Sequence, residues 1–413
     1  MAKIFPFQPY RFASKAGPLD SLVTQPYDKI TPRMRARYLS LSPYNLVRVI
    51  LGERFPSDSE TGNVYTRAAR YLTDWISSGI LAQDPEPGLF ACFQEFSCPD
   101  TGERLLRKGF IGLGAVEDYA VGTVHRHEET LSGPKIDRLE LLRHTRAHAG
   151  QLFMLYPDPL GEIDRILDTV AQAGPPLEVV DEYQAIHRLW KISDPRLIAR
   201  IQQLMADNRL LIADGHHRYE TALAFRNQNP DLEGARNVMM TFVNLHSPGL
   251  RILATHRVVH SLDRFDAGAF LHTAGQRFHL TPLESLEALR RAWAEPHPEA
   301  IRIGVALSGS LSLLDAAREP GALDVSFLHQ ALLQNLLGLD EADIREQRHL
   351  RYLRGLDAAV DQVRSGAAQL AFLLQPVPVS EVARIAFAGG VMPQKSTDFY
   401  PKLLSGLAIY KLD

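Results

Sequence analysis

Apolar and polar positions follow two different patterns on either side of residue 215. Residues 210–213 are all apolar, which is typical of a buried strand. Further along, Tyr219, Ala222 and Leu223 stand at i, i+3 and i+4, the spacing of one face of a helix. Gly215 lies between the two segments, where the backbone must turn and where glycine tolerates a positive φ. The pattern predicts a buried strand, a glycine turn and a helix, in that order.

Other segments carry helical or strand periodicity and are bounded by proline, glycine and polar turn residues. They predict helices at residues 32–38, 63–78 and 135–146, antiparallel strands at residues 89–96 and 105–113, and a hairpin of residues 238–245 and 251–259. Residues 263–375 alternate short helices and strands and gather few functional side chains. We therefore expect an α+β protein with a first domain at residues 1–262, which begins with an N-terminal extension. The second, smaller α/β domain is expected at residues 263–413, with a tail at residues 389–404 that returns to the site.

The composition is that of a globular protein and narrows the function mainly by exclusion. Of 413 residues, 45% are hydrophobic and 23% are charged, and the formal net charge is −3. A charge so close to zero argues against a general nucleic-acid binder, so no DNA partner is expected. No apolar stretch approaches the length of about 18 residues that a membrane span needs, and the N-terminus does not resemble a signal peptide. Two cysteines, Cys92 and Cys98, fit a reducing environment, and we expect a cytoplasmic protein.

The predicted turn at residue 215 concentrates groups that bind anions. His216, His217 and Arg218 follow the glycine in the first turn of the predicted helix. A helix N-terminus also presents unpaired N–H groups and the positive end of the helix dipole. Together these features favour a phosphate-binding site. The alternative is an ordinary strand-to-helix turn in which the histidines lie on the surface and Asp214 caps the helix.

A second polar region covers residues 125–146. In its predicted helix, the cations Lys135 and Arg138 share one sector, about 100° wide, with leucines that should make this face half-buried. Cations on a half-buried face need an anionic partner. That partner is either a carboxylate of the chain, Glu128 or Asp137, or the phosphate of a ligand.

A third polar region, residues 389–402, combines glycines, hydroxyl groups, lysines and an aromatic pair. Polar and aromatic loops of this kind often carry function. Lys395, Ser396 and Thr397 are its candidates for phosphate binding. The alternative is a terminal loop that Phe399 and Tyr400 pin to the surface.

Four blocks of the sequence together resemble a bacterial family known as domain of unknown function 1015, and the resemblance extends over nearly the whole chain. The blocks are Gln25-Pro26-Tyr27-Asp28 with Pro43-Tyr44-Asn45, His127-Glu128-Glu129-Thr130 with Lys135 and Asp137-Arg138, Asp214-Gly215-His216-His217-Arg218, and Met392-Pro393-Gln394-Lys395-Ser396-Thr397. The family itself implies no activity.

Residues 215–222 also resemble the Gly-x-x-Arg-x-x-x-Ala box of the ParB nucleotidases, sulfiredoxin and the ADP-dependent free-serine kinases. This resemblance implies a ParB/sulfiredoxin-like mixed core in which the box opens a phosphate-holding helix. It assigns Gly215 as the glycine that allows close approach and Arg218 as the cationic anchor, with His216 and His217 beside the phosphate. Sulfiredoxin chemistry needs a cysteine where this chain has a histidine, so that activity is not expected. The gene neighbourhood of the family hints at serine or phosphoserine as substrate.

The motifs predict a phosphotransferase or phosphohydrolase that acts on a small hydroxylated substrate, with ATP, ADP or another nucleotide as partner. Such chemistry needs cations on the phosphate oxygens, an in-line acceptor and a base. The catalytic candidates are His217, His216, Asp28 and Glu128. The phosphate- or nucleotide-binding candidates are Gly215, Arg218, His127, Lys135, Arg138, Lys395, Ser396 and Thr397. Asp214 is the candidate ligand of Mg²⁺, which prefers oxygen ligands. The prediction requires these distant segments to surround one anion pocket.

Other interpretations stay open at this stage. The rival function is a nucleotide-binding regulatory switch without efficient turnover, and a scaffolding protein fits the dense polar motifs least. A zinc site at His125, His127 and Glu128 lacks a further ligand at a fitting spacing. His216 and His217 point about 100° apart on a helix, so only one of them can face a small ligand. The sequence does not fix the oligomeric state.

Overall fold

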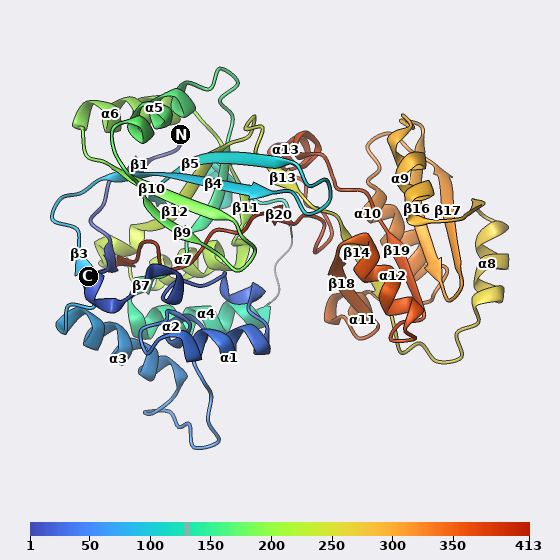
Figure 1. The fold of residues 1–413 in the computed structure, drawn as a ribbon, viewed down its shortest axis with the longest axis horizontal. Helices are drawn as coiled ribbons and strands as arrows, with labels where there is room; N and C mark the ends of the chain where they lie inside the picture. Colours follow the sequence, from blue (N-terminus) through green and yellow to red (C-terminus); the bar gives the residue numbers. More distant parts are fainter. Residues whose placement is uncertain (129–131) are drawn as a thin grey trace. The chain divides into compact units, whose positions relative to one another are not determined.

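The computed structural model describes residues 1–128 and 132–413, and these form two compact units. Figure 1 shows their helices and strands. Unit 1 comprises Met1–Arg251, Ala386–Gly390 and Phe399–Asp413, and unit 2 comprises Ile252–Ile385 and Val391–Asp398. Unit 2 is thus inserted into the chain of unit 1. The change of unit after residue 251 lies before the predicted boundary at residue 262, and the segment after residue 398 belongs to unit 1 rather than to the second domain.

In its described residues, unit 1 contains a mixed nine-stranded sheet with the order β6-β11-β8-β12-β5-β4-β10-β9, in which β1 also pairs with β5. The pairs β6–β11 and β8–β12 are parallel, and the other neighbours are antiparallel. The strands are β1 (Ile4–Phe5), β4 (Leu89–Ser97), β5 (Arg104–Ala115), β6 (Val124–His125), β8 (Leu152–Tyr156), β9 (Leu177–Val180), β10 (Ile186–Ile192), β11 (Leu210–Asp214) and β12 (Asn237–Asn244). The predicted α+β class is confirmed, as is the antiparallel pairing of β4 with β5.

Helices and short ribbons complete unit 1. The helices are α1 (Pro32–Leu41), α2 (Val47–Ile50), α3 (Val64–Ser77), α4 (Ser132–Thr145), α5 (Glu162–Gln172), α6 (Pro195–Met205) and α7 (His216–Gln228). The ribbons pair β2 (Tyr10–Phe12) with β3 (Leu81–Gln83) and β7 (Ala147–His148) with β21 (Tyr410–Lys411). The predicted helices at residues 32–38 and 63–78 are α1 and α3. Their first turns are capped by the side chains of Thr31 and Asn63, as the sequence of each start favours.

The two faces of the unit 1 sheet pack against different layers. Because side chains alternate along a strand, Ala91 and Phe93 of β4 face one layer while Phe90 and Cys92 face the other. The first layer contains α5 and α6, which Figure 1 shows together on one side of the sheet. The second layer contains the chain after residue 398, Phe399–Asp413, which we call the returning segment, through residues such as Leu404. The returning segment is therefore part of the core of unit 1.

Unit 2 is built on an antiparallel sheet with the order β15-β17-β16-β19-β14-β18. Its strands are β14 (Thr255–Val259), β15 (His279–Leu283), β16 (Ala300–Leu307), β17 (Ser310–Ala317), β18 (Leu350–Arg354) and β19 (Leu370–Leu373). Its helices are α8 (Ala267–Gly275), α9 (Leu286–Ala294), α10 (Asp324–Phe327), α11 (Glu341–Glu346) and α12 (Leu356–Arg364), with a π-helical turn at Leu328–Gln334. The elements β13 (Arg251–Ile252), α13 (Val379–Phe387) and β20 (Phe399–Tyr400) lie where the chain passes from one unit to the other.

The predicted hairpin of residues 238–245 and 251–259 is wrong. Both edges of β12 are already paired, one with β5 and the other with β8, so no edge is left for a following strand. The strand β14 instead pairs with β18 and β19 in unit 2. The proline and glycine at residues 248–249, which suggested a tight turn, lie just before the change from one unit to the other.

Candidate functional site

The turn between β11 and α7 has the predicted form. The strand β11 ends at Asp214, the helix begins at His216, and Gly215 between them has a φ of +101°. A Cβ atom on Gly215 would approach Leu152 Cδ2 to 2.9 Å and Arg218 Nη2 to 3.1 Å. Glycine is thus required here for its backbone conformation and for the close approach of the Arg218 head group.

Asp214 joins two cations at this turn. Its Oδ1 accepts a hydrogen bond from Lys402 Nζ at 2.9 Å, and its Oδ2 accepts one from Arg218 Nη2 at 2.6 Å. Burial by itself raises the pKa of the Asp214 carboxyl, but the charges of Lys402, Arg218 and Lys29 hold that pKa well below its usual range. Asp214 is therefore ionised at neutral pH. Lys402, Arg218 and Lys29 thus all act on one carboxylate at this turn.

Lys402 was not among the predicted site residues, although it lies in the predicted polar tail. Only 7% of its side chain is exposed. Lys402 belongs to unit 1 because the chain returns to that unit at Phe399. The motif at residues 392–397 predicts Lys395 as the cation of this tail. The signal that could have found Lys402 is the aromatic pair Phe399-Tyr400, whose burial carries the following residues into the core.

A cavity of about 70 Å³ lies beside Arg218. Arg138, Tyr27 and Ser405 contribute polar groups to its wall, and Leu141 contributes apolar surface. The Arg138 guanidinium lies 4.1 Å from the centre of the Tyr27 ring. Burial and the neighbouring Asp28 raise the pKa of Tyr27 to about 12, so its hydroxyl keeps its proton at neutral pH. A water molecule needs roughly 10–15 Å³ of such space, so the cavity has room for a few waters or a small polar group.

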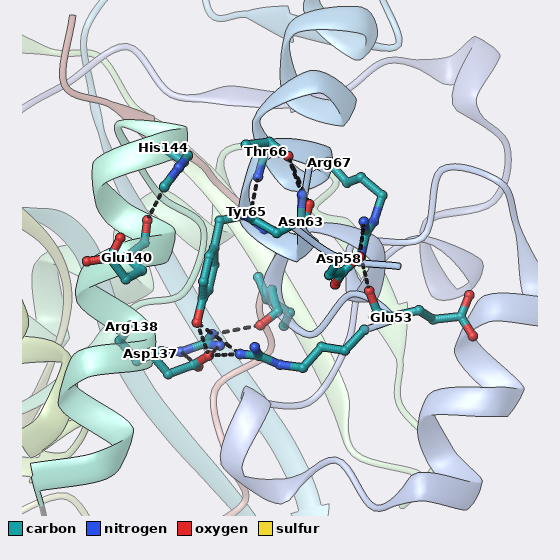
Figure 2. Close-up of polar contacts among 12 residues, drawn as sticks. Glu53, Asp58, Asn63, Tyr65, Thr66, Arg67, Asp137, Arg138, Glu140 and His144 are labelled. Atoms are coloured by element: carbon teal, nitrogen blue, oxygen red, sulfur yellow. Dashed lines mark hydrogen bonds and ion pairs between the residues drawn. The ribbon is translucent and has the colours of Figure 1, made fainter. Parts of the chain in front are cut away.

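Arg138 has a carboxylate partner within the chain. It forms an ion pair with Asp137 and donates a hydrogen bond to the carbonyl oxygen of Ile50 at 2.6 Å. Asp137 also accepts hydrogen bonds from the Tyr65 hydroxyl at 2.9 Å and from Arg54 at 2.6 Å (Figure 2). Of the two anionic partners considered for Arg138, a carboxylate of the chain or a ligand phosphate, the structure shows the carboxylate of Asp137. Its guanidinium nevertheless stays on the wall of the cavity that Arg218 shares.

Lys135 does not line the 70 Å³ cavity. It forms an ion pair with Glu220 of α7, and Arg126 Nη1 lies 3.6 Å from the same carboxylate. These side chains line an open depression of about 460 Å³, separate from the 70 Å³ cavity, although Thr221 borders both. The expectation that Lys135 and Arg138 face one ligand together is therefore wrong. Lys135 lines the open depression, whereas Arg138 lines the 70 Å³ cavity.

The histidine cluster is more buried than predicted. His127 is fully buried, and its Nδ1 donates a hydrogen bond to the carbonyl oxygen of Ile212 at 2.8 Å. Its ring packs against that of His216, with 4.7 Å between the ring centres. Burial lowers the pKa of both histidines, and the neighbouring His127 lowers that of His216 further. His216 is thus the packed, neutral member of its pair, and His217 is the half-buried one.

Of the remaining predicted residues, two belong to unit 1 and three belong to unit 2. Glu128 is half-buried, with its Oε1 3.9 Å from His127 Nε2, whereas Asp28 is exposed. Lys395, Ser396 and Thr397 belong to unit 2, where Ser396 borders a cavity of about 820 Å³. Their part in the phosphate site stays a prediction. Glu129 and Thr130 of the second motif lie outside the described residues.

The carboxylates do not form a metal site by themselves. Within residues 1–128 and 132–413, no three His, Cys, Asp or Glu side chains gather as they would around a metal ion. Both oxygens of Asp214 are engaged by cations, which leaves a poor site for Mg²⁺. The metal-binding role of Asp214 stays a prediction.

Comparison with known proteins gives a family and weak structural likenesses. The family described as protein of unknown function (DUF1015) matches residues 4–341. No curated protein matches this chain. Among the described helices, none is long and apolar enough to cross a membrane.

Three solved structures illustrate the structural likenesses. A conserved hypothetical protein from Pyrococcus furiosus is 12% identical and covers 70% of this chain and 92% of its own, with a TM-score of 0.37. A free serine kinase in complex with AMP is 12% identical and covers 70% and 90%, with a TM-score of 0.36. SbnI with a C-terminal truncation, from Staphylococcus aureus, is 12% identical and covers 72% and 87%, with a TM-score of 0.35. Scores this low carry no argument about what this chain does.

Proposed function

The chain belongs to the DUF1015 family, which carries no assigned activity, and we propose a function from the geometry of unit 1. Unit 1 binds the phosphate of a small ligand at the N-terminus of α7. It transfers a phosphoryl group between a nucleotide, such as ATP or ADP, and a small hydroxyl-bearing acceptor, for which serine is the candidate. The observation that supports this proposal best is that Arg218 and Lys402 meet at Asp214, directly before the N-terminus of α7.

The cations at this turn are of the kind that bind phosphate. Lys402 and Arg218 share one carboxylate, and the field of Lys29 reaches the same group. Arginine and lysine form strong charge-assisted hydrogen bonds with phosphate oxygens. The N–H groups at the start of α7 point to the same place, beyond Gly215, and add donors for phosphate oxygens. The adjoining cavity of about 70 Å³ suits a single small group.

The transfer step divides roles among these side chains. The acceptor oxygen forms a bond to the terminal phosphorus, and the bond from phosphorus to the bridging oxygen breaks, with the electron pair leaving on the nucleotide. Arg218 and Lys402 neutralise the phosphate oxygens, and Asp214 holds the two cations in place. Because its pKa is so low, Asp214 is a weak base. The acceptor proton therefore passes to Glu128 or His217, the two half-buried candidates.

Binding measurements test the phosphate site. We expect calorimetry to show saturable binding of inorganic phosphate or ADP, with an Arg218→Gln variant weaker by about tenfold or more, because a charged hydrogen bond contributes about 1.5–3 kcal/mol. The matched control is Arg200→Gln on α6, whose side chain is 46% exposed and contacts Glu162 at 2.8 Å and Gln203 at 2.9 Å. Equal binding by wild type and Arg218→Gln would remove Arg218 from the site.

Turnover measurements distinguish a phosphotransferase from a regulatory switch that binds a nucleotide without turnover. The protein is incubated with serine, Mg²⁺ and either ATP or ADP, and phosphoserine is detected by mass spectrometry. Phosphoserine formation that is lost in Arg218→Gln supports the transferase. Saturable nucleotide binding without any product, across a panel of hydroxyl acceptors, supports the regulatory switch instead. Absence of both binding and product would refute the proposal.

A further inference from the structure

Arg107 is a fully buried cation that no acidic group contacts in the described part of the chain. It lies on β5, on the face of the sheet that the returning segment covers. Its Nε donates to Gln94 Oε1 at 2.9 Å, and its Nη1 donates to the carbonyl oxygen of Tyr400 at 3.0 Å. Its Nη2 donates to Gln94 Oε1 and to the carbonyl oxygen of Pro401. The guanidinium also stacks on Phe153, 4.6 Å from the ring centre.

A buried arginine without a carboxylate partner stabilises a core less than apolar side chains would. A buried charge costs several kcal/mol unless it is paired, and apolar side chains of similar size often replace buried ionic groups without loss of stability. Such local conflicts in a fold occur mostly where a site has to be held in place. The contacts of Arg107 therefore indicate what it holds.

What Arg107 holds is the backbone directly before Lys402. Its two amino groups bind consecutive carbonyl oxygens, those of Tyr400 and Pro401. Gln94, which Arg107 orients, donates from Nε2 to the next carbonyl oxygen, that of Lys402, at 3.0 Å. Three successive peptide groups are thus fixed from one side, and the Lys402 side chain extends to Asp214.

A buried network fixes Gln94 in turn. Its Nε2 also donates to His187 Nδ1 at 3.1 Å, so both the amide oxygen and the amide nitrogen have assigned partners. His187 then carries its proton on Nε2 and donates it to Asp181 Oδ2 at 3.1 Å. Asp181 is anchored by the backbone N–H groups of Tyr183 and Ala185, each at 2.9 Å. The orientation of every side chain in the series is determined by its neighbour.

We propose that Arg107 is a positioning residue for the phosphate site, acting through Gln94 and the peptide groups of residues 400–402 to hold Lys402 against Asp214. The proposal rests on the proposed function for the statement that Lys402 binds phosphate. The positioning itself does not depend on that function. Arg107 touches no ligand, because the returning segment covers it.

The first test measures the freedom of Lys402 directly. An amine-directed reagent is applied to the folded full chain, and peptide mass spectrometry compares labelling of Lys402 with that of Lys3, whose side chain is 65% exposed. In wild type we expect Lys402 to be labelled far more slowly than Lys3. In Arg107→Met the Lys402 rate should rise at least tenfold, and in Arg107→Lys it should rise less. The control is Arg104→Met on the same strand, where the arginine is 71% exposed.

A second variant keeps the test decisive if Arg107→Met does not fold. Gln94→Glu gives Arg107 a carboxylate partner but removes the donor to the Lys402 carbonyl oxygen. A purely structural role predicts that this variant is at least as stable as wild type, with Lys402 still protected. Positioning predicts a folded protein with faster Lys402 labelling. Protection of Lys402 in folded Arg107→Met or Gln94→Glu would overturn the inference.

Measurements of phosphate affinity test whether the position of Lys402 affects binding at the proposed phosphate site. If wild type binds phosphate, we expect Arg107→Met to bind it at least tenfold more weakly, with partial rescue in Arg107→Lys. If wild type binds no phosphate, the proposed function fails, and the labelling experiment still decides whether Arg107 positions Lys402. Full phosphate affinity in folded Arg107→Met, with Lys402 exposed to the reagent, would show that Lys402 takes no part in binding.

Discussion

Replacement of Asp214 by asparagine removes the negative charge that Lys402 and Arg218 share, and it should destabilise unit 1. Loss of one partner of a buried ion pair costs about 3–5 kcal/mol, because the remaining charge stays buried. The Asp214 side chain is 18% exposed, so we expect a value near the lower end, about 3 kcal/mol at pH 7. The matched control is Asp168→Asn, whose surface pair with Lys108 should be worth less than about 1 kcal/mol.

The pH dependence of this loss identifies its cause. The folded-state pKa of Asp214 is depressed, so its contribution to stability is fully present above the unfolded-state pKa of about 3.9 and is lost as pH falls towards the folded-state pKa. The difference in unfolding free energy between wild type and Asp214→Asn should therefore be constant from pH 7 to about pH 5. It should shrink progressively below about pH 4.

Urea unfolding followed by tryptophan fluorescence measures this difference. Of the three tryptophans, Trp75 and Trp190 lie in unit 1 and Trp293 lies in unit 2. A Trp293→Phe background therefore confines the signal to unit 1 in every variant. A loss of stability as large at pH 3 as at pH 7 would refute the ionic explanation. A loss at pH 7 no greater than that of the control would show that the shared carboxylate contributes little.

Further predictions concern the same unit. Phosphate should raise the unfolding temperature of Asp214→Asn more than that of wild type, since the anion supplies the missing charge; an equal rise in both would argue against a shared site. Gly215→Ala should cost about 1–2 kcal/mol in urea unfolding, because of the positive φ and the contact with Leu152, whereas an unchanged midpoint would mean that the turn relaxes. Tyr219→Phe should cost about 1–2 kcal/mol, since its hydroxyl bonds the backbone of residue 117 at 3.0 and 2.6 Å. Burial raises the pKa of Cys92 to about 12, so a disulfide reagent at pH 8 should modify it only in denaturant.

The local parts of the site were predictable from the sequence. The apolar run before Gly215 and the helical spacing after it are local patterns, and they correspond to β11 and α7. The strands β4 and β5 were predictable for the same reason, since a short polar turn joins two alternating segments. Backbone geometry and short-range periodicity carry this information without tertiary context.

Long-range features could not be predicted in the same way. Lys135 and Arg138 share a helix sector in the sequence, but in the structure Lys135 pairs with Glu220 and Arg138 pairs with Asp137, and the two line different cavities. Lys402 reaches Asp214 from a segment whose backbone contacts Arg107 and Gln94 on the sheet, and polar residues on strands give no periodic signal of such contacts. The sequence also did not reveal the insertion of unit 2. The strand patterns of β12 and β14, joined by a proline and a glycine, predict a single hairpin, whereas the two strands belong to different units.

The insertion of unit 2 has a consequence for synthesis of the chain. Asp214 and Lys402 are separated by 188 positions, and most of the intervening residues form a unit of their own. At roughly 5–20 residues per second, a ribosome needs on the order of 10–40 s to travel from one to the other. During that interval the nascent polypeptide exposes the sheet face that residues 399–408 later cover. Chaperones that shield apolar surface should therefore associate with this chain until the second strand-bearing unit has emerged and the final segment can dock.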